Sequence, residues 1–281
     1  MKNIRLFETE TEMNEAVIEE CSVSYVIENN KVYTTPENGG QGGVDYSAMY
    51  TTFEALEDGL TIRFSENFAD FSENPSEFEY RIDNGEWYAL PFGETTPSIN
   101  TGQNIQFKND NPLILGELGI GTFVLSKKCK ASGNIMSLHY GDDFIGKTDL
   151  TGKNNAFTAL FAGSTNLIDT VNLQLPATTL SSRCYQSMFY DCSSLTTAPI
   201  LPATTLAEVC YDWMFNGCSK LNNITMLATD ISAEYCLNEW VSGVASTGTF
   251  VKHPDMTSLP TGESGIPEGW TVVDYSSQSP A

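Results

Sequence analysis

A 26-residue unit occurs twice in succession, and this repeat constrains the fold more than any other feature of the chain. Residues 175–180 (LPATTL) return as residues 201–206, and the apolar residues that follow each copy return at the same spacing. These repeated positions are Cys184, Met188, Phe189, Cys192 and Leu195, followed by Cys210, Met214, Phe215, Cys218 and Leu221. A fixed period of about 20 to 29 residues is typical of folds in which successive units stack and bury a shared core.

We therefore expect a short leucine-rich-repeat-type solenoid over residues 141–252, followed by a C-terminal cap and tail over residues 253–281. Residues 156–167 fit a first, divergent unit, and Cys236 keeps the period in an atypical last unit. If the segment CYQSMFYDC is helical, Cys184, Met188 and Cys192 lie on one face of that helix. The two cysteines of one unit are then too far apart for a disulfide. Five of the seven cysteines lie in the repeats, and we interpret them as buried free thiols that fill the core.

The region before the repeats has the pattern of short strands. Alternating apolar residues in LTIRF (60–64) and FEYRI (78–82) predict strands, and the turn at residues 83–85 predicts a hairpin with EWYAL (86–90). Several short strands at close spacing predict a β-sandwich over residues 48–140. Trp87 and Tyr88 in this hairpin are assigned a packing role, with sugar binding as the alternative.

Residues 1–35 are expected to form a small anchor or oligomerisation segment made of a helix and a hairpin. Thr9 and Glu12 fit a capping box before a helix, and SVSYVI and KVYTT read as two strands joined by a turn. Such a short segment cannot bury a stable core alone, so it must dock on another surface. The predicted anchor contacts are Ile4, Leu6, Phe7, Met13, Val17, Tyr25 and Tyr33. Residues 36–47 contain four glycines and are expected to form a flexible linker. The predicted fold class is thus a multidomain α+β protein.

The charge of the chain excludes some partners. The formal net charge is −22, which repels a nucleic-acid backbone. We find no signal-peptide pattern at the amino terminus and no apolar run of about 18 residues, so we expect neither export by that route nor membrane insertion.

The residues available for catalysis are few. His139 stands near Asp142 and Asp143, where an acid–base pair or a calcium site is conceivable, but the spacing matches no known metal loop and a turn after a strand is favoured. No phosphate-binding loop or nucleophile elbow is present in the sequence. We therefore predict a protein that is not an enzyme and needs no cofactor or metal. Exposed aromatic residues suit recognition of a protein or glycan, and the candidate binding face comprises Tyr185, Tyr190, Tyr211, Trp213 and Tyr235.

Two segments resemble known families. The repeat pattern, with Leu-Pro followed by Met-Phe-x-x-Cys, resembles the BspA-like leucine-rich repeats of gut Bacteroidales and their phages, which are usually adhesive modules. Residues 5–36 (RLFETETEMNEAVIEECSVSYVIENNKVYTTP) are similar to the amino-terminal segments of virion proteins from crAss-like and related gut bacteriophages.

The resemblance implies a structural virion protein, either a head fibre or a capsid decoration. Such a protein is made in the host cytoplasm, attaches to capsid or auxiliary capsid proteins through its amino terminus, and displays an adhesive repeat domain for host attachment. A homo-oligomer, either dimer or trimer, and a host-surface glycan or protein ligand are the further expectations. The alternatives are a phage tail fibre or receptor-binding protein, and a bacterial surface adhesin.

Overall fold

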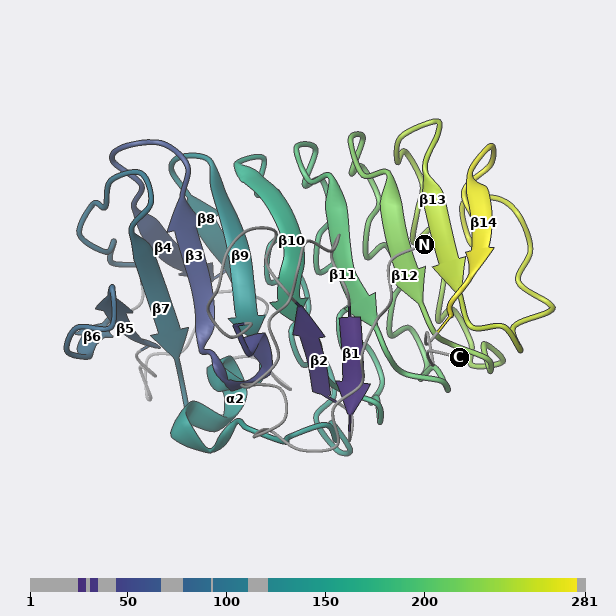
Figure 1. Ribbon diagram of the computed structural model, residues 1–281, viewed down its shortest axis with the longest axis horizontal. Helices are drawn as coiled ribbons and strands as arrows, with labels where there is room; N and C mark the ends of the chain where they lie inside the picture. Colours follow the sequence, from purple (N-terminus) through teal and green to yellow (C-terminus); the bar gives the residue numbers. More distant parts are fainter. Residues whose placement is uncertain are drawn as a thin grey trace, which may run out of the picture.

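The computed structural model describes the backbone of residues 25–28 and 31–34, and residues 44–66, 78–91, 93–110 and 121–276 in full (Figure 1). The protein is mostly β, with 32% of residues in strands and 5% in helices, and the described residues contain one short α-helix, α2 (Ser137–Tyr140). The predicted α+β class is therefore wrong. The same part of the chain also contains two short 3-10 helices, η1 (Tyr46–Ala48) and η2 (Gly141–Asp143).

The amino-terminal strands β1 (Tyr25–Glu28) and β2 (Lys31–Thr34) pair in antiparallel register, with Tyr25 opposite Thr34 and Val26 opposite Tyr33. No helix-plus-hairpin unit is present among the described residues, contrary to the predicted anchor. The residues predicted to be helical lie outside the described part of the chain, as do the anchor residues Ile4, Leu6, Phe7, Met13 and Val17.

A mixed six-stranded sheet occupies the first half of the molecule, in the order β10-β9-β3-β7-β5-β6. Its strands are β3 (Thr51–Ala55), β5 (Phe78–Ile82), β6 (Tyr88–Leu90), β7 (Asn104–Lys108), β9 (Cys129–Asn134) and β10 (Leu167–Gln174). The hairpin predicted at residues 83–85 is confirmed, because β5 and β6 pair antiparallel and Asp83 and Asn84 both have positive φ.

The β-sandwich prediction is wrong because the large sheet is not confined to residues 48–140. Strand β10 lies in the repeat region and pairs in parallel with β9, so the sheet continues into the repeats. The strands β4 (Ile62–Glu66) and β8 (Gly121–Leu125) form a separate two-stranded sheet. The Phe64 and Phe123 rings of these two strands pack on the aromatic residues of the large sheet.

The repeats contribute one strand per unit to a parallel four-stranded sheet. Its strands are β11 (Thr197–Leu201), β12 (Asn223–Met226), β13 (Thr249–Lys252) and β14 (Thr271–Asp274). Thr197 pairs with Asn223 and Asn223 pairs with Thr249, so residues one repeat apart lie side by side. Figure 1 shows β10 to β14 in chain order along the longest axis of the molecule.

The segments that return from one repeat strand to the next contain no α-helix, and the structure has no leucine-rich-repeat solenoid of the predicted kind. Their backbone alternates between right-handed and left-handed turns, with positive φ at Arg183, Tyr185, Ser187 and Asp191. Many of the other N–H groups in these segments donate to the carbonyl three residues earlier, as the Met188 N–H does to the Tyr185 carbonyl. The three-dimensional periodicity is therefore set by contacts between units and not by a helix within each unit.

Hydrogen bonds between neighbouring return segments run mainly in one direction. The N–H groups of Ser187 and Phe189 donate to the carbonyls of Asp212 and Met214 at 2.8 and 2.9 Å, and Trp213 and Phe215 donate in turn to the next unit. Tyr185 is an exception and donates back to Ala156. Residues 156–241 thus form a stack of hydrogen-bonded units, which we call the repeat stack.

Two columns of aromatic rings form the interior of the repeat stack. One runs through Phe161, Phe189 and Phe215, with ring centroids 5.2 and 5.4 Å apart. The other runs through Phe157, Tyr185 and Tyr211, at 5.6 and 6.3 Å. Both columns end on Trp240, which is fully buried. This continuous core explains why the Met-Phe and Cys positions repeat in the sequence.

The six cysteines that the structure describes are free and buried, as predicted for the five in the repeats. Burial raises the pKa of the Cys184 and Cys192 thiols to about 12. The Cys192 thiol lies 3.0 Å from the Phe161 carbonyl and the Cys218 thiol lies 3.0 Å from the Phe189 carbonyl. Cys192 and Cys218 therefore serve as small core residues that also satisfy a backbone acceptor in the preceding unit.

Candidate functional site

The predicted binding face is divided between the surface and the core. Tyr185 and Tyr211 are each 1% exposed and belong to an interior aromatic column, so their assignment to the binding face is wrong. A helix in this segment would turn these two side chains outward, whereas the actual backbone turns them inward. Trp213 and Tyr235 are exposed, and Tyr190 is half-buried.

Trp213 and Tyr190 form an ordered aromatic pair on the outside of the repeat stack. Their rings are stacked with centroids 5.8 Å apart, and 41% of Trp213 remains exposed. Three polar side chains at one-repeat spacing are joined on the same stack: the Gln186 and Asn238 amides each donate to Asp212, at 2.8 and 2.9 Å. These bonds hold the polar side chains of three successive units in fixed positions.

His139 and the acidic residues near it do not form a catalytic pair. His139 is 3% exposed, and neither of its ring nitrogens has a hydrogen-bond partner. Asp142 accepts instead from Lys108 Nζ at 2.9 Å and from the Tyr50 hydroxyl at 2.8 Å, and these bonds lower the pKa of its carboxyl. Asp143 is exposed. Among the described residues, no three His, Cys, Asp or Glu side chains are grouped in a way that could hold a metal ion.

The buried His139 makes the fold sensitive to acid. Burial, with a smaller effect of Lys153, lowers its pKa from 6.5 to about 4. Between these values the unfolded chain binds a proton that the folded chain does not, so stability falls as pH decreases from about 6.5 to about 4, by roughly 3 kcal/mol from this group. Urea unfolding at a series of pH values should show this loss in the wild type and not in His139→Phe. Equal pH dependence of the two proteins would contradict the assignment.

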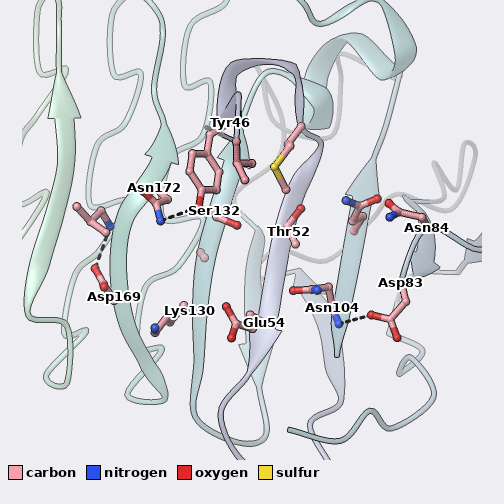
Figure 2. A pocket seen from close by; sticks show the side chains of 15 residues that line it. Tyr46, Thr52, Glu54, Asp83, Asn84, Asn104, Lys130, Ser132, Asp169 and Asn172 are labelled. Carbon is pink, nitrogen blue, oxygen red and sulfur yellow. Dashed lines mark hydrogen bonds between the residues drawn. The ribbon is translucent and has the colours of Figure 1, made fainter. Parts of the chain in front are cut away.

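A hollow of about 540 Å³ lies on the outer face of the six-stranded sheet and was not predicted from the sequence (Figure 2). Its floor is made of polar side chains that form two rows across strands β7, β3, β9 and β10. In the first row the register aligns Asn104, Glu54, Lys130 and Asp169. In the second row it aligns Gln106, Thr52, Ser132 and Asn172.

An irregularity in β10 brings two of these residues into the hollow. Asp169 and Asn172 are three positions apart and would face opposite sides of a regular strand. The register shifts between Asp169 and Asn172, and the buried positions of β10 are Leu167, Thr170 and Leu173, also three apart. The bulge therefore allows both polar side chains to line the same side of the sheet.

One wall of the hollow is the short helix η1, and hydrogen bonds fix its position. The Asn134 side chain donates to the Ser47 carbonyl at 2.9 Å, and the Asn172 side chain donates to the Tyr46 hydroxyl at 3.2 Å. Figure 2 shows Tyr46 above the strands that carry Asn172 and Ser132. Partial burial raises the pKa of Tyr46, and the nearby Glu54 carboxylate adds to this effect. These hydrogen bonds hold the wall in place against β9 and β10.

A cluster of cations and aromatic rings lies on the same outer face of the sheet. Arg81 and Lys108 both lie 4.7 Å from the Trp87 ring centroid, and Trp87 contacts Tyr50 edge to face at 4.9 Å. Arg81 also donates to the Gln106 amide oxygen, which belongs to the second row of the floor. Trp87 therefore has the packing role expected for it, and it holds two basic side chains near the hollow.

The hollow could have been found only in part from the sequence. The alternation of polar and apolar residues in β3, β7 and β9 indicates which side chains face outward. The order of the strands and the bulge in β10 depend on long-range pairing, for which no short motif exists.

No protein-family model matches this sequence, and the searches of curated proteins and of solved structures returned no significant match. No helix in the described parts of the chain is long and apolar enough to cross a bilayer.

Proposed function

We propose that this chain is a structural bacteriophage virion protein, of the head-fibre or capsid-decoration type, that binds a host-surface ligand without catalysing a reaction. In this proposal residues 1–35 attach the chain to a capsid or auxiliary capsid protein, and the repeat stack is displayed outward. The resemblance of the amino-terminal segment to phage virion proteins supports the attachment role. The domain boundaries at residues 35, 47, 140 and 252 stay predictions.

The stacked pair of exposed Trp213 and half-buried Tyr190 is the observation that carries the binding role. Tryptophan and tyrosine supply large contact areas with few rotatable bonds, and they are enriched among residues that dominate binding energy. The stacking of Trp213 on Tyr190 orders both rings before any partner arrives, which lowers the entropy cost of binding. Tyr235, in the next unit of the stack, is also exposed and remains part of the proposed binding face.

Display of several copies would strengthen contacts that are weak individually. A dimer or trimer of this chain, repeated over a particle, converts later binding steps into intramolecular ones. A modest affinity of one repeat stack for a glycan or protein is then sufficient for attachment to a cell.

Particles purified from a lysate on a density gradient test the proposal directly. We expect mass spectrometry to find this chain at a fixed ratio to the major capsid protein across the particle peak. The chain should stay with the particles after washing in high salt if it is a structural component. Its absence from the particle peak would overturn the virion assignment.

The same preparation can test the binding surface. Particles carrying Trp213→Ala should bind host cells at least about thirtyfold more weakly per site, since a dominant interface residue contributes about 2 kcal/mol or more. Ile145→Ala is the matched control, because Ile145 is an exposed apolar residue, 54% exposed, outside the candidate surface. Equal adsorption of both variants and the wild type would exclude Trp213 from the binding site.

A further inference from the structure

We propose that the hollow on the outer face of the six-stranded sheet binds a neutral, polyhydroxylated saccharide. This site is separate from the Trp213–Tyr190 surface, and the proposal does not depend on the virion role. Its volume of about 540 Å³ falls in the range of small-molecule sites. With strands about 4.8 Å apart, the four-strand floor is about 14 Å long, enough for about two or three linked sugar rings.

The floor carries hydrogen-bonding groups that the other described residues leave unused. Glu54 and Lys130 are paired in register on neighbouring strands, yet neither side chain makes a hydrogen bond or ion pair with another described residue. The same holds for the Ser132 hydroxyl and the Asn104 side-chain amide. Figure 2 shows Glu54 and Lys130 close together with no bond drawn between them. Donors and acceptors therefore alternate along the first row and remain available to a ligand.

A sugar hydroxyl both donates and accepts hydrogen bonds. It therefore matches the alternating donors and acceptors of the first row better than a group that can only donate or only accept. Vicinal hydroxyls can donate to the Glu54 carboxylate and accept from the Lys130 ammonium at the same time. The Asn104 amide offers both a donor and an acceptor at the next strand. The Tyr46 ring stands at the wall and can cover an apolar face of the sugar.

The charge and composition of the lining exclude other classes of ligand. The lining holds three carboxylates, Glu54, Asp83 and Asp169, against one lysine, Lys130, so it disfavours an acidic sugar or a phosphate group. Of the two basic side chains beside the hollow, Lys108 is already paired with Asp142. The lining is mainly polar, which does not suit a lipid chain. No group of three metal-binding side chains is present in the described residues.

An extended peptide is also excluded by the topology. Peptides that add to a sheet bind at an open edge, where backbone groups lack partners. Strands β3, β7 and β9 are interior strands of the six-stranded sheet, and their backbone groups are already paired on both sides. Only side chains are free to bind on this floor.

The site is also fixed in position before a ligand binds. Its floor lies on hydrogen-bonded strands, and its η1 wall is tied to β9 and β10 by Asn134 and Asn172. Binding therefore requires little ordering of the protein, which favours measurable affinity for a small ligand.

Saturation-transfer NMR on the full chain tests the proposal with a defined panel of probes. The neutral probes are cellobiose, maltose, lactose, mannobiose and diacetylchitobiose, and the acidic probes are glucuronic acid and N-acetylneuraminic acid. We expect saturable binding of at least one neutral disaccharide, and at least tenfold weaker binding of both acidic sugars. Binding of none of the neutral probes, or a preference for the acidic ones, would overturn the proposal.

Variants locate the binding to the hollow. Lys130→Met and Glu54→Gln, alone and together, should each weaken binding of the neutral disaccharide, with about a tenfold or larger loss in the double variant. The matched control is Lys220→Met with Glu268→Gln, which changes charge equally at exposed positions outside the hollow. Trp213→Ala should leave this binding unchanged, which separates the test from that of the repeat surface. Unaltered affinity in the Lys130 and Glu54 variants would refute the site.

Discussion

Replacing Phe123 with alanine is expected to lower the free energy of unfolding by about 3–5 kcal/mol, the usual cost of removing a buried phenylalanine. Phe123 is fully buried, and its ring contacts five other phenylalanines. Four of these belong to the sheets and one to the repeat stack, and they are Phe53, Phe64, Phe78, Phe107 and Phe161.

Phe123 lies where the sheets meet the repeat stack, so its truncation should destabilise both parts of the molecule. Its ring is stacked with Phe161 at 6.0 Å, and Phe161 begins the aromatic column that continues through Phe189. Its N–H donates to the Leu160 carbonyl at 2.9 Å, so the backbone crosses the same junction. We therefore expect the sheets and the repeat stack to unfold together in the wild type and to separate more easily in Phe123→Ala.

Val124→Ala provides the matched control for this prediction. Val124 is the next residue of β8 and is 39% exposed, so its truncation should change stability by about 0.5 kcal/mol or less. Guanidinium unfolding followed by both tryptophan fluorescence and circular dichroism measures the two variants. A loss of under about 1 kcal/mol in Phe123→Ala would show that the interior repacks around the missing ring.

The second large effect is expected for Gly133→Ala, which should cost about 4 kcal/mol. Gly133 has a φ of +80°, a conformation that costs about 1–2 kcal/mol for other residues. A Cβ atom there would lie 2.1 Å from the Tyr50 carbonyl oxygen, a backbone atom that cannot move without displacing the start of β3. The added methyl group must therefore shift either β9 or β3.

Gly152→Ala separates the two contributions. Gly152 has a φ of +74°, but no atom lies within 4 Å of the position of its Cβ. Gly152→Ala should therefore lower the free energy of unfolding only by the cost of the backbone conformation, about 1–2 kcal/mol. Thermal unfolding of both variants tests the difference, and equal melting temperatures would mean that the contact with Tyr50 relaxes at no cost. Because Asn134 follows Gly133 and fixes η1, Gly133→Ala should also weaken saccharide binding.

The sequence identified the repeat and its core but not the conformation of the units. The apolar residues at one-repeat spacing were correctly assigned to the interior, since burial depends mainly on composition and period. The i, i+4, i+8 spacing of Cys184, Met188 and Cys192 is compatible with a helix, but it also fits the alternating turns that the segment adopts. Tyr185 and Tyr211 were misassigned to the surface for the same reason.

The sheet region shows a second limit of local sequence patterns. The hairpin at residues 83–85 could be predicted, because its turn requires residues that tolerate positive φ. The parallel pairing of β9 with β10 joins residues far apart in the chain, and it alone brings Lys130 beside Asp169. The hollow therefore depends on topology, and its residues share no contiguous motif.

The direction of the hydrogen bonds in the repeat stack makes its two ends chemically different. At the first end, carbonyl groups accept from β8, as Leu160 accepts from Phe123; at the last, N–H groups donate onward, as Val241 donates to the Glu263 carbonyl at 3.1 Å. The closing elements are not interchangeable, whereas the units between them are nearly equivalent. Gene duplication can thus lengthen the protein by whole 26-residue units, each adding about 4.8 Å of reach, while both ends and the sheet that carries the hollow stay unchanged.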